Sequence, residues 1–569
     1  MKMKSEFSFE DIHTAAILYM ALVLLCFFCG FLRWYYALIS CGVLLVVLWC
    51  ILRKNNIEKC EVHQHYSRKT ILFVFAFSLV WSYLGGMNGY WYQSSDWDCR
   101  NAIYFDLIQY NWPVIYAQNG QALVYYVGHW LPPACLAKLV QTLTGSVRWG
   151  RFMGRMFLWG WSSIGLSIII LMIFQAVGAQ TKKKRIAALF LFVFFSGLDF
   201  LGGAYLQRLD YLLNPSLLHL EWWCPGYQYT SIMACLFWVF NQTIIPWMIT
   251  LCFVMERDVR NYIYYCVVCL LCGTLPCIGL VILMLVKALM YVVKTIRLRR
   301  FREVPGTVFS VQNLAAFLIL FPLVASFVLT SNTAGFMTKG RQKAFGNLQV
   351  LTPEETQNER GANYQLQPMA LKTTDETSES GERISETRTM SSNAVSLEES
   401  GVFSSAYFNK KLAGFFMIEV GFYLLCIFPD HRKNPLYYTL CLCFLFIPYF
   451  RVGTSHDFCM RVSVPGFFIL MLYVNQFLLA HYPVMWRENH ASLKDRNLKQ
   501  IAAVLLMICF AVGAITPAVE LYRGVYNVEK QGTIRLEDQS IMTFNRERVP
   551  DNFACSQPED HFFFRYLAG

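Results

Sequence analysis

Long runs of apolar residues recur along the whole chain of 569 residues, separated by short polar stretches. A run of about 20 apolar residues crosses roughly 30 Å of hydrocarbon as a helix. Runs of this kind lie at residues 14–33, 35–52, 71–90, 152–178, 186–204, 233–254, 262–294, 311–330, 411–428, 435–450, 460–480 and 500–517. The run 262–294 is interrupted by Gly273 and Pro276, so we expect two helices there. The pattern predicts an all-α polytopic membrane protein with about 12–13 transmembrane helices.

The composition supports this interpretation. Hydrophobic residues make up 56% of the chain and charged residues only 15%, whereas soluble domains carry about a quarter. The formal charge of +12 comes from lysines and arginines in short clusters between apolar runs, so we expect no nucleic-acid partner. The chain carries no Walker motif, no dinucleotide-binding glycine pattern and no HExxH. An activated substrate would therefore be membrane-borne or enter from outside.

The basic clusters predict the orientation of the spans. They lie at residues 53–54, 68–69, 182–185, 257–260, 297–302, 431–433 and 494–499. Placing all of them in the cytoplasm puts the N-terminus there and leaves residues 91–151 wholly outside. The apolar stretch 123–140 does not cross, because crossing would turn the 182–185 cluster outward. We expect one large first external loop with two surface helices, near 98–112 and 121–144.

The chain divides into two regions by this pattern. Residues 1–517 form the transmembrane domain, and residues 518–569 form a short external tail. A second long external loop, 331–410, is rich in Ser, Thr, Glu and Asn, which predicts a mobile segment or one that orders over a substrate.

Most of the twenty cysteines lie inside apolar runs. The CxxC pairs Cys26–Cys29, Cys266–Cys269 and Cys269–Cys272 have no histidine beside them. They are interpreted as small packing residues rather than as metal or redox sites.

Charged residues at the membrane border are costly and usually functional or paired. Asp96, Asp98 and Arg100 follow the span 71–90 in the first external loop. Either carboxylate suits a general base that deprotonates an acceptor hydroxyl, and the two together suit a shared divalent cation. The alternative is that Asp96 or Asp98 caps a helix beginning near Arg100. Asp106, further along that helix, is expected on its solvated face.

A second charged group falls in "FRVGTSHDFCMRVSVPG". Arg451, His456 and Arg461 suit an anionic headgroup or a substrate phosphate. The alternative for Arg461 is an internal ion pair with Asp457, four residues earlier on one helical face, and the two roles are compatible.

Other polar residues are expected to line the substrate: His129, Glu221, Trp222 and Asp457. Trp222 lies in "LLHLEWWCPGYQY", where aromatic residues suit either the interfacial belt or stacking on a sugar. Asn241 and Gln242 place amides inside a span, where they bond across helices or line a cavity.

The chain resembles the GT-C superfamily of membrane glycosyltransferases. The likeness rests on "SDWDCRNAIYFDLIQYNWPVIY", "LVYYVGHWLPPACLAKL", "WVFNQTIIPWMIT", "GTSHDFCMRVSVPGFFIL" and "FFFRYLAG", and it spans most of the chain apart from the 331–410 loop. These segments are similar to a large group of bacterial membrane proteins of that type. The similarity identifies a family more specifically than it identifies a reaction.

The resemblance implies a GT-C-like bundle in the bacterial cytoplasmic membrane and sugar transfer on its outer face. The donor would be a polyprenyl-phosphate-linked sugar, and the acceptor a glycan, lipid or protein of the cell envelope. The family's catalytic acid typically lies in the first external loop, which matches Asp96 or Asp98 here, and Asp98 is the preferred of the two. Arg451, His456 and Arg461, with Arg100, would bind the donor phosphate. Some members need a divalent metal such as Mg or Mn, for which Asp96 and Asp98 are the candidates.

Three other functions compete with this one. A transporter or lipid-linked glycan flippase needs charged residues buried at mid-membrane and often inverted repeats, whereas most titratable residues here lie at the ends of spans. A glycan polymerase uses a similar lipid-linked substrate but usually has its large loop later in the chain. A non-catalytic envelope-assembly scaffold keeps a fold without its chemistry.

Overall fold

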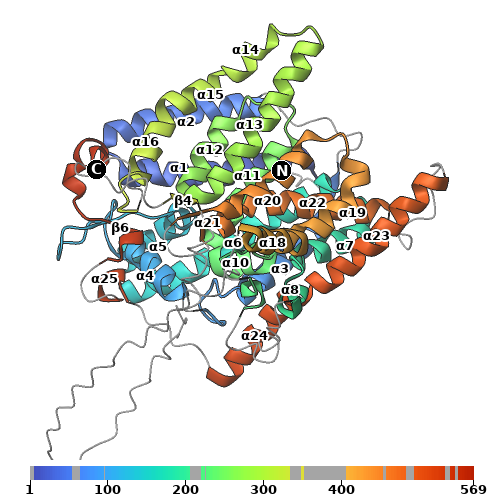
Figure 1. The fold of residues 1–569 in the computed structure, drawn as a ribbon. Helices are drawn as coiled ribbons and strands as arrows, with labels where there is room; N and C mark the ends of the chain where they lie inside the picture. The colour runs from blue at the N-terminus through green and yellow to red at the C-terminus, as the bar shows by residue number, and fades with distance from the viewer. Residues whose placement is uncertain are drawn as a thin grey trace, which may run out of the picture.

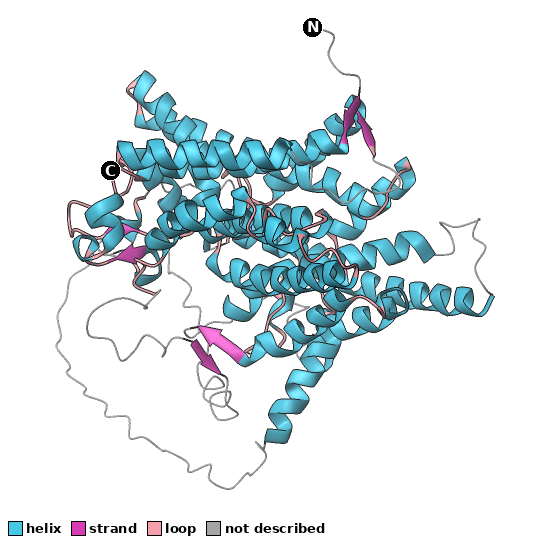
Figure 2. Ribbon diagram, turned by 90° about the horizontal axis from the view of Figure 1, so that it is seen from above, coloured by secondary structure: helices cyan, strands magenta, loops and turns pink. Residues whose placement is uncertain are grey.

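The computed structural model describes residues 6–53, 64–94, 96–205, 219–224, 226–333, 348–350, 405–452, 457–481, 493–531, 539–544 and 549–569. This part of the chain is built from helices, with three small strand pairs (Figure 2). It contains eight helices long and apolar enough to cross a membrane, or nine if one bent pair is a single span. Shorter apolar helices accompany them, including 262–272 and 435–449. The prediction of an all-α multi-pass membrane protein is confirmed, with fewer full-length spans than the expected 12–13.

The N-terminal helices are α1 (Phe9–Phe31), α2 (Trp34–Arg53) and α3 (Arg68–Leu84). Ser8 and Asp11 form a capping box that starts α1. Strand β1 (Glu6–Ser8) pairs antiparallel with β2 (His65–Ser67), so α1 and α3 begin side by side.

The predicted first external loop contains two helices, as expected. They are α4 (Asp96–Gln109) and α5 (Leu131–Thr144), joined through β3 (Ala122–Leu123) and η1 (Gly128–Trp130). Helix α4 buries most of its residues, so it packs into the bundle instead of only resting on it. The long helix α6 (Val147–Ala176) follows and packs against α5 and α3.

The middle of the chain departs from regular spans. The predicted span 186–204 is split into α7 (Lys182–Val193) and α8 (Asp199–Tyr205), and η2 (Leu220–Trp222) follows. The predicted span 233–254 is broken into α10 (Ile232–Val239) with η3 (Phe240–Gln242), and α11 (Ile244–Met255). The two parts are bent by 101°, as in a broken span or a re-entrant loop.

The predicted break at Gly273 is confirmed. Helix α12 (Tyr262–Cys272) ends there and α13 (Thr274–Arg297) begins. The short helix α14 (Glu303–Val308) leads into a continuous helical stretch formed by α15 (Val311–Ala315), η4 (Ala316–Leu320) and α16 (Phe321–Val328).

The next spans contain a π-helical turn. Helices α18 (Ser405–Phe416), η6 (Met417–Gly421) and α19 (Phe422–His431) form one helical run, in which η6 is the π-turn. The run is followed by α20 (Pro435–Phe446), η7 (Ile447–Tyr449), β5 (Phe450–Val452), α21 (Asp457–Val462) and α22 (Val464–His481). Strand β5 pairs with β4 (Leu348–Val350). Most of the predicted mobile loop 331–410 lies outside the described residues.

The C-terminal region begins with α23 (Leu493–Gly513) and α24 (Ile515–Gln531), which run on as one 33-residue candidate span, Leu498–Lys530. Figure 1 shows α24 continuing from α23 and lying near α8. Helix α24 continues through residues 517 and 518, where the tail was expected to begin. The remaining elements are α25 (Ile541–Phe544), η9 (Asp551–Phe553), β6 (Ala554–Cys555), η10 (Pro558–Asp560) and η11 (Phe563–Leu567).

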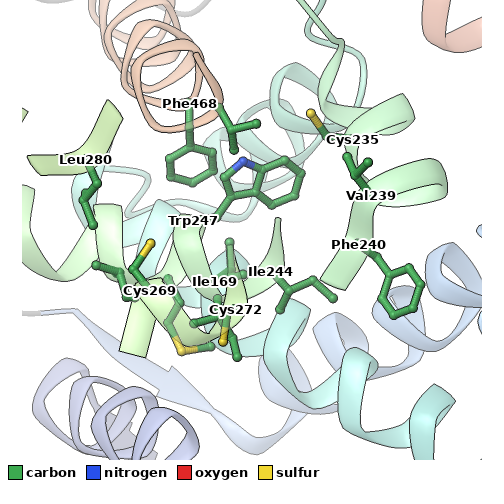
Figure 3. Packing of buried hydrophobic residues seen from close by; sticks show 14 of the residues in the cluster. Ile169, Cys235, Val239, Phe240, Ile244, Trp247, Cys269, Cys272, Leu280 and Phe468 are labelled. Atoms are coloured by element: carbon green, nitrogen blue, oxygen red, sulfur yellow. The ribbon is translucent and has the colours of Figure 1, made fainter. Parts of the chain in front are cut away.

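Aromatic and sulfur side chains fill the centre of the bundle (Figure 3). Trp247 of α11 stacks on Phe468 of α22 with ring centroids 5.4 Å apart. Cys269 and Cys272 of α12 are fully buried beside them as free thiols. Their interpretation as packing residues is confirmed.

Candidate functional site

Helix α4 begins at Asp96, four residues before the start expected near Arg100. Asp96 and Asp98 therefore lie in the first turn of α4 rather than at its N-cap. In the first turn the positive end of the helix dipole still stabilises their negative charges. Arg100 Nη2 donates to Asp96 Oδ2 at 3.1 Å, one helical turn away. The Arg100 side chain is only 7% exposed, whereas that of Asp96 is 60% exposed. This ion pair connects a buried cation to a surface carboxylate.

The geometry of α4 does not favour a metal shared by Asp96 and Asp98. Helical residues two positions apart do not face one another, because each residue turns the side-chain direction by about 100°. Among the described residues no group of three or more His, Cys, Asp or Glu side chains is placed to hold a metal ion. The two aspartates therefore do not fit the divalent cation that the resemblance left open.

A second ion pair lies at the start of the α21–α22 region. Arg461 Nη2 contacts Asp457 Oδ2 at 3.1 Å, which confirms the pair expected from their spacing of four residues. The Arg461 side chain is 15% exposed and that of Asp457 43%. As in α4, the arginine is turned inward and its carboxylate partner outward.

The two ion pairs belong to one electrostatic neighbourhood. Burial alone would lower the pKa of Arg461, but the negative charge of Asp457, with a smaller contribution from Asp96, holds this pKa above its usual value. Helix α4 and the Arg461–Asp457 pair of α21, distant in sequence, thus lie within electrostatic range of each other.

Each buried arginine keeps one N–H without an acceptor in the part of the chain that the structure describes. The atoms are Arg100 Nη1 and Arg461 Nε. A buried donor on a charged group is costly to leave without a hydrogen bond. These N–H groups therefore favour the binding of an anionic acceptor. An anion with several oxygens, such as a phosphate, satisfies such donors.

The break in the α10–α11 span supplies a third contact. Gln242 Oε1 lies 3.5 Å from Arg461 Nη1, and Gln242 Nε2 lies 3.3 Å from the Tyr125 hydroxyl. Its neighbour Asn241 is fully buried, and neither amide atom has a partner among the described residues. The expectation that these amides bond across helices is confirmed for Gln242.

His129 is packed in the interior, although it was expected to line the substrate. It is fully buried, and its Nε2 lies 3.0 Å from Ser162 Oγ of α6. The rings of Trp161 and Phe240 flank it, with centroids 6.5 and 5.5 Å away. Burial lowers its pKa to about 3, so the ring is neutral.

Glu221 is also buried, at 1% exposure, although it was expected at the substrate. It accepts the Ser231 backbone N–H at 2.9 Å and Gln228 Nε2 at 3.1 Å. Burial first, and then the charge of Asp199, raise its pKa to about 8. Trp222, next in the chain, is 38% exposed.

Buried carboxyl groups next to Glu221 form a feature that the sequence reasoning missed. Asp199 and Glu419 are 0% and 1% exposed and lie close enough to act on one another. Asp199 Oδ2 accepts from Ser196 and Thr516, each at 2.8 Å, and Glu419 accepts from Trp223 Nε1 at 2.6 Å. The signal was present, since Glu419 lies in the middle of the predicted span 411–428 and Asp199 inside 186–204.

Glu520 and Arg523 of α24 were also missed, because they fell in the expected tail. Both are buried, at 4% and 6% exposure, and both contact His219. The available signal was the helical spacing of Leu521, Val525 and Val528 beyond the apolar run 500–517.

Two further predicted phosphate ligands add little to this picture. Arg451 lies in β5, where its backbone pairs with Gln349 of β4. His456 lies outside the described residues.

The site therefore combines exposed carboxylates, buried arginines with open donors and a broken span, all within a helical membrane bundle. Comparison of the chain with protein-family models, with curated proteins and with solved structures finds no match.

Proposed function

We propose that the protein is a membrane glycosyltransferase that moves a sugar from a polyprenyl-phosphate-linked donor to a cell-envelope acceptor on the extracytoplasmic face. The observation that carries the proposal is that Arg100 and Arg461, two inward-turned guanidinium groups with open nitrogen donors, each pair with a more exposed carboxylate, and that the charge of Asp96 also acts on Arg461. An anion-binding group beside a carboxylate at a membrane border suits a lipid-linked phosphate and a hydroxyl acceptor.

In the proposed reaction the arginines bind the leaving phosphate and an aspartate acts on the acceptor. The carboxylate takes the proton of the acceptor hydroxyl, whose oxygen attacks the anomeric carbon with inversion. The bond from that carbon to the phosphate oxygen breaks, and the polyprenyl phosphate leaves as an anion stabilised by the guanidinium groups. A phosphate leaving group needs little protonation, so a single carboxylate on the acceptor side is sufficient.

Asp96 is better placed for this role than Asp98, the base favoured by the resemblance. Asp96 shares the helical face of Arg100, and its charge acts on Arg461. Asp98 is exposed on another face of α4.

The test is mass spectrometry of cell-surface glycans from strains carrying the native gene, a deletion, Asp96→Asn, Asp98→Asn or Arg461→Gln at matched expression. A sugar absent from the deletion strain and from the Asp96→Asn and Arg461→Gln strains, but present with Asp98→Asn, supports the proposal and the base assignment. Loss with Asp98→Asn instead moves the base role to Asp98. Identical glycans in the native and deletion strains contradict surface glycosylation.

A lipid-linked glycan flippase or transporter is the second candidate, and two observations favour it. The α10–α11 span is broken by 101° next to the buried Asn241. Glu419 is a carboxyl group buried inside a candidate span, Lys410–His431. Broken helices and intramembrane carboxyl groups are typical of transport sites. Accumulation of a complete lipid-linked sugar on the cytoplasmic side of the deletion strain would favour this function over transfer.

A further inference from the structure

Beside the Asp96 region lies a group of aromatic and ionised side chains contributed by four separate segments. We name it the α24 cluster. Its members are Tyr92, His219, Trp222, Trp238, Glu520 and Arg523. Both of its charged residues, Glu520 and Arg523, come from the helix that the sequence placed in a tail.

Aromatic rings form the partly exposed side of the α24 cluster. The His219 ring lies 4.6 Å from Trp222 and 3.5 Å from Trp238, and the two indoles are 6.4 Å apart. Trp222 is 38% exposed, and Trp238 and Tyr92 are partly buried. An exposed indole held by its neighbours offers a rigid apolar surface at low entropy cost.

Ionised groups form the buried side of the cluster. Glu520 Oε1 lies 2.9 Å from His219 Nδ1, and Arg523 Nη1 lies 2.7 Å from His219 Nε2. Arg523 Nη1 also contacts Nδ1 of the same ring, and because arginine can only donate, the ring accepts from it through an unprotonated nitrogen. Burial lowers the pKa of His219 against the opposing charge of Glu520, consistent with a neutral ring. Glu520 and Arg523 are thereby fixed in position.

Arg523 retains an open donor. Its side chain is 7% exposed, its guanidinium carbon lies 5.9 Å from the centroid of the Trp238 ring, and its charge acts on Tyr92, yet Nε has no acceptor in the described part of the chain. A buried, charged N–H without an acceptor favours a ligand oxygen at that point. An apolar ring surface beside fixed charged hydrogen-bonding groups is the chemistry that binds a carbohydrate, whose rings have apolar faces and hydroxyl edges.

The α24 cluster also lies where an acceptor of the cell envelope can reach it, beyond the lipid core and near Asp96. The candidate span Leu498–Lys530 has 33 residues and is about 50 Å long, some 20 Å more than roughly 30 Å of hydrocarbon, so its C-terminal part reaches beyond the lipid core. The charge of Asp96 acts on His219 as it does on Arg461. Asp96 therefore lies within electrostatic range of both the arginine region that suits the donor phosphate and the α24 cluster.

We propose that the α24 cluster is the binding subsite for a carbohydrate acceptor, with Trp222 stacking on a sugar ring and Arg523 Nε donating to one of its oxygens. This inference rests on the proposed transfer reaction and assigns its acceptor class as a glycan. It places both the acceptor hydroxyl and the lipid phosphate near Asp96.

The test measures glycan binding by the purified full-length protein in lipid nanodiscs. The probe is the fluorescently labelled surface-glycan fraction of the deletion strain, which carries the unmodified acceptor if the transfer proposal holds. Fluorescence polarisation gives the affinity of the native protein and of Trp222→Ala, Trp222→Phe and Arg523→Gln. We expect the Ala and Gln variants to bind at least about tenfold more weakly, and Trp222→Phe to fall between them and the native protein.

Two variants serve as matched controls. Tyr522→Ala changes an aromatic residue of α24 that is 55% exposed, and Arg461→Gln changes the donor region. Both are expected to keep native affinity for the glycan, and thermal melting identifies any variant that fails to fold. Absence of glycan binding by the native protein, or equal affinities for the native protein, Trp222→Ala and Trp222→Phe, overturns the inference.

Failure of the transfer proposal is recognised separately, by identical glycan masses in the native and deletion strains. Binding that still depends on Trp222 and Arg523 would then retain the α24 cluster as a carbohydrate site without sugar transfer.

Discussion

Buried ionisable side chains in this protein are compensated in two different ways. Arg100 and Arg461 turn inward but keep a carboxylate partner near the surface. Asp106 is 1% exposed, although it was expected on a solvated face, because α4 packs its middle into the protein. Asp106 accepts the Tyr116 hydroxyl at 2.7 Å and the backbone N–H of Ile541 at 3.1 Å. The arginines near the membrane border thus keep donors that can bind ligands, whereas the buried carboxyl group of Asp106 links separate segments of the chain.

Asp106 makes stability depend on pH. Burial raises its pKa to about 6 from 3.8, against the hydrogen bonds that lower it. The folded state then holds this proton more tightly than the unfolded state. The stabilisation of the folded state by this proton is complete below about pH 4. It falls by about 3 kcal/mol as the pH rises through 6. We expect the melting temperature of the native protein, relative to Asp106→Asn, to fall between pH 4 and pH 7. Parallel curves for the two proteins would contradict this.

The Asp199–Glu419 contact requires a shared proton, because two carboxylates have no hydrogen to place between them. Glu419→Gln supplies an N–H toward Asp199 and keeps an oxygen for Trp223 Nε1, so we expect a free energy of unfolding within about 1 kcal/mol of native. Glu419→Ala leaves Trp223 Nε1 without its acceptor and Asp199 without its carboxyl neighbour, both in the interior, and we expect a loss of about 2–4 kcal/mol. Chemical denaturation in detergent measures both, and equal losses would exclude a shared proton.

At the scale of elements, α13 and α21 approach closely at a glycine. A Cβ at Gly279 would lie 2.0 Å from the backbone carbonyl oxygen of Val462, the residue after Arg461. Gly279→Ala must therefore push α21 away from α13. We expect a loss of stability of about 1–3 kcal/mol and reduced transfer activity. Gly160→Ala in α6 is the matched control, because a Cβ there meets nothing within 4 Å and alanine favours a helix. Equal melting temperatures for the two variants would show that α21 is not held by this contact.

Local signals in the sequence predicted some elements and could not predict others. The break between α12 and α13 was visible because Gly273 and Pro276 disfavour a continuous helix. The 101° bend near Gln242 had only a partial signal, because Pro246 lacks the N–H that would bond the Gln242 carbonyl but residues 240–243 contain no glycine or proline. It is held by distant contacts, such as the 2.8 Å bond from Trp97 Nε1 to the Phe237 carbonyl. The Arg461–Asp457 pair was likewise predictable from its spacing.

The candidate site follows the same division. Arg100 and Arg461 could be identified from the chain because each lies one helical turn from its partner. The contribution of α24 could not, since Glu520 meets His219 only after the whole bundle has assembled, across 301 positions of the chain. Side chains that reach the site through tertiary packing leave no local spacing to detect.

At the scale of the whole molecule, the C-terminal residues close the bundle against its first helices. Strand β6 pairs with β3, and Gly569 donates its backbone N–H to the Phe31 carbonyl at 3.0 Å. Arg33, between α1 and α2, donates from Nε to the Ala568 carbonyl and from Nη2 to the Arg565 carbonyl, each at 3.0 Å. Figure 1 shows the C-terminus beside α16 and the N-terminal helices.

We therefore expect Arg33→Ala to release the C-terminal segment while the spans stay folded. A single arginine satisfies two carbonyl oxygens here, and its loss removes both charge-assisted bonds, about 1.5–3 kcal/mol each. Hydrogen–deuterium exchange should rise in residues 563–569 and stay unchanged in α22, whose backbone is buried in the bundle. Arg53→Ala, at the end of α2, is the control and should leave exchange in 563–569 at the native level. Unchanged exchange in Arg33→Ala would mean that η11 and β6 hold the C-terminus without the arginine, whereas a rise throughout the protein would make Arg33 a determinant of the entire bundle.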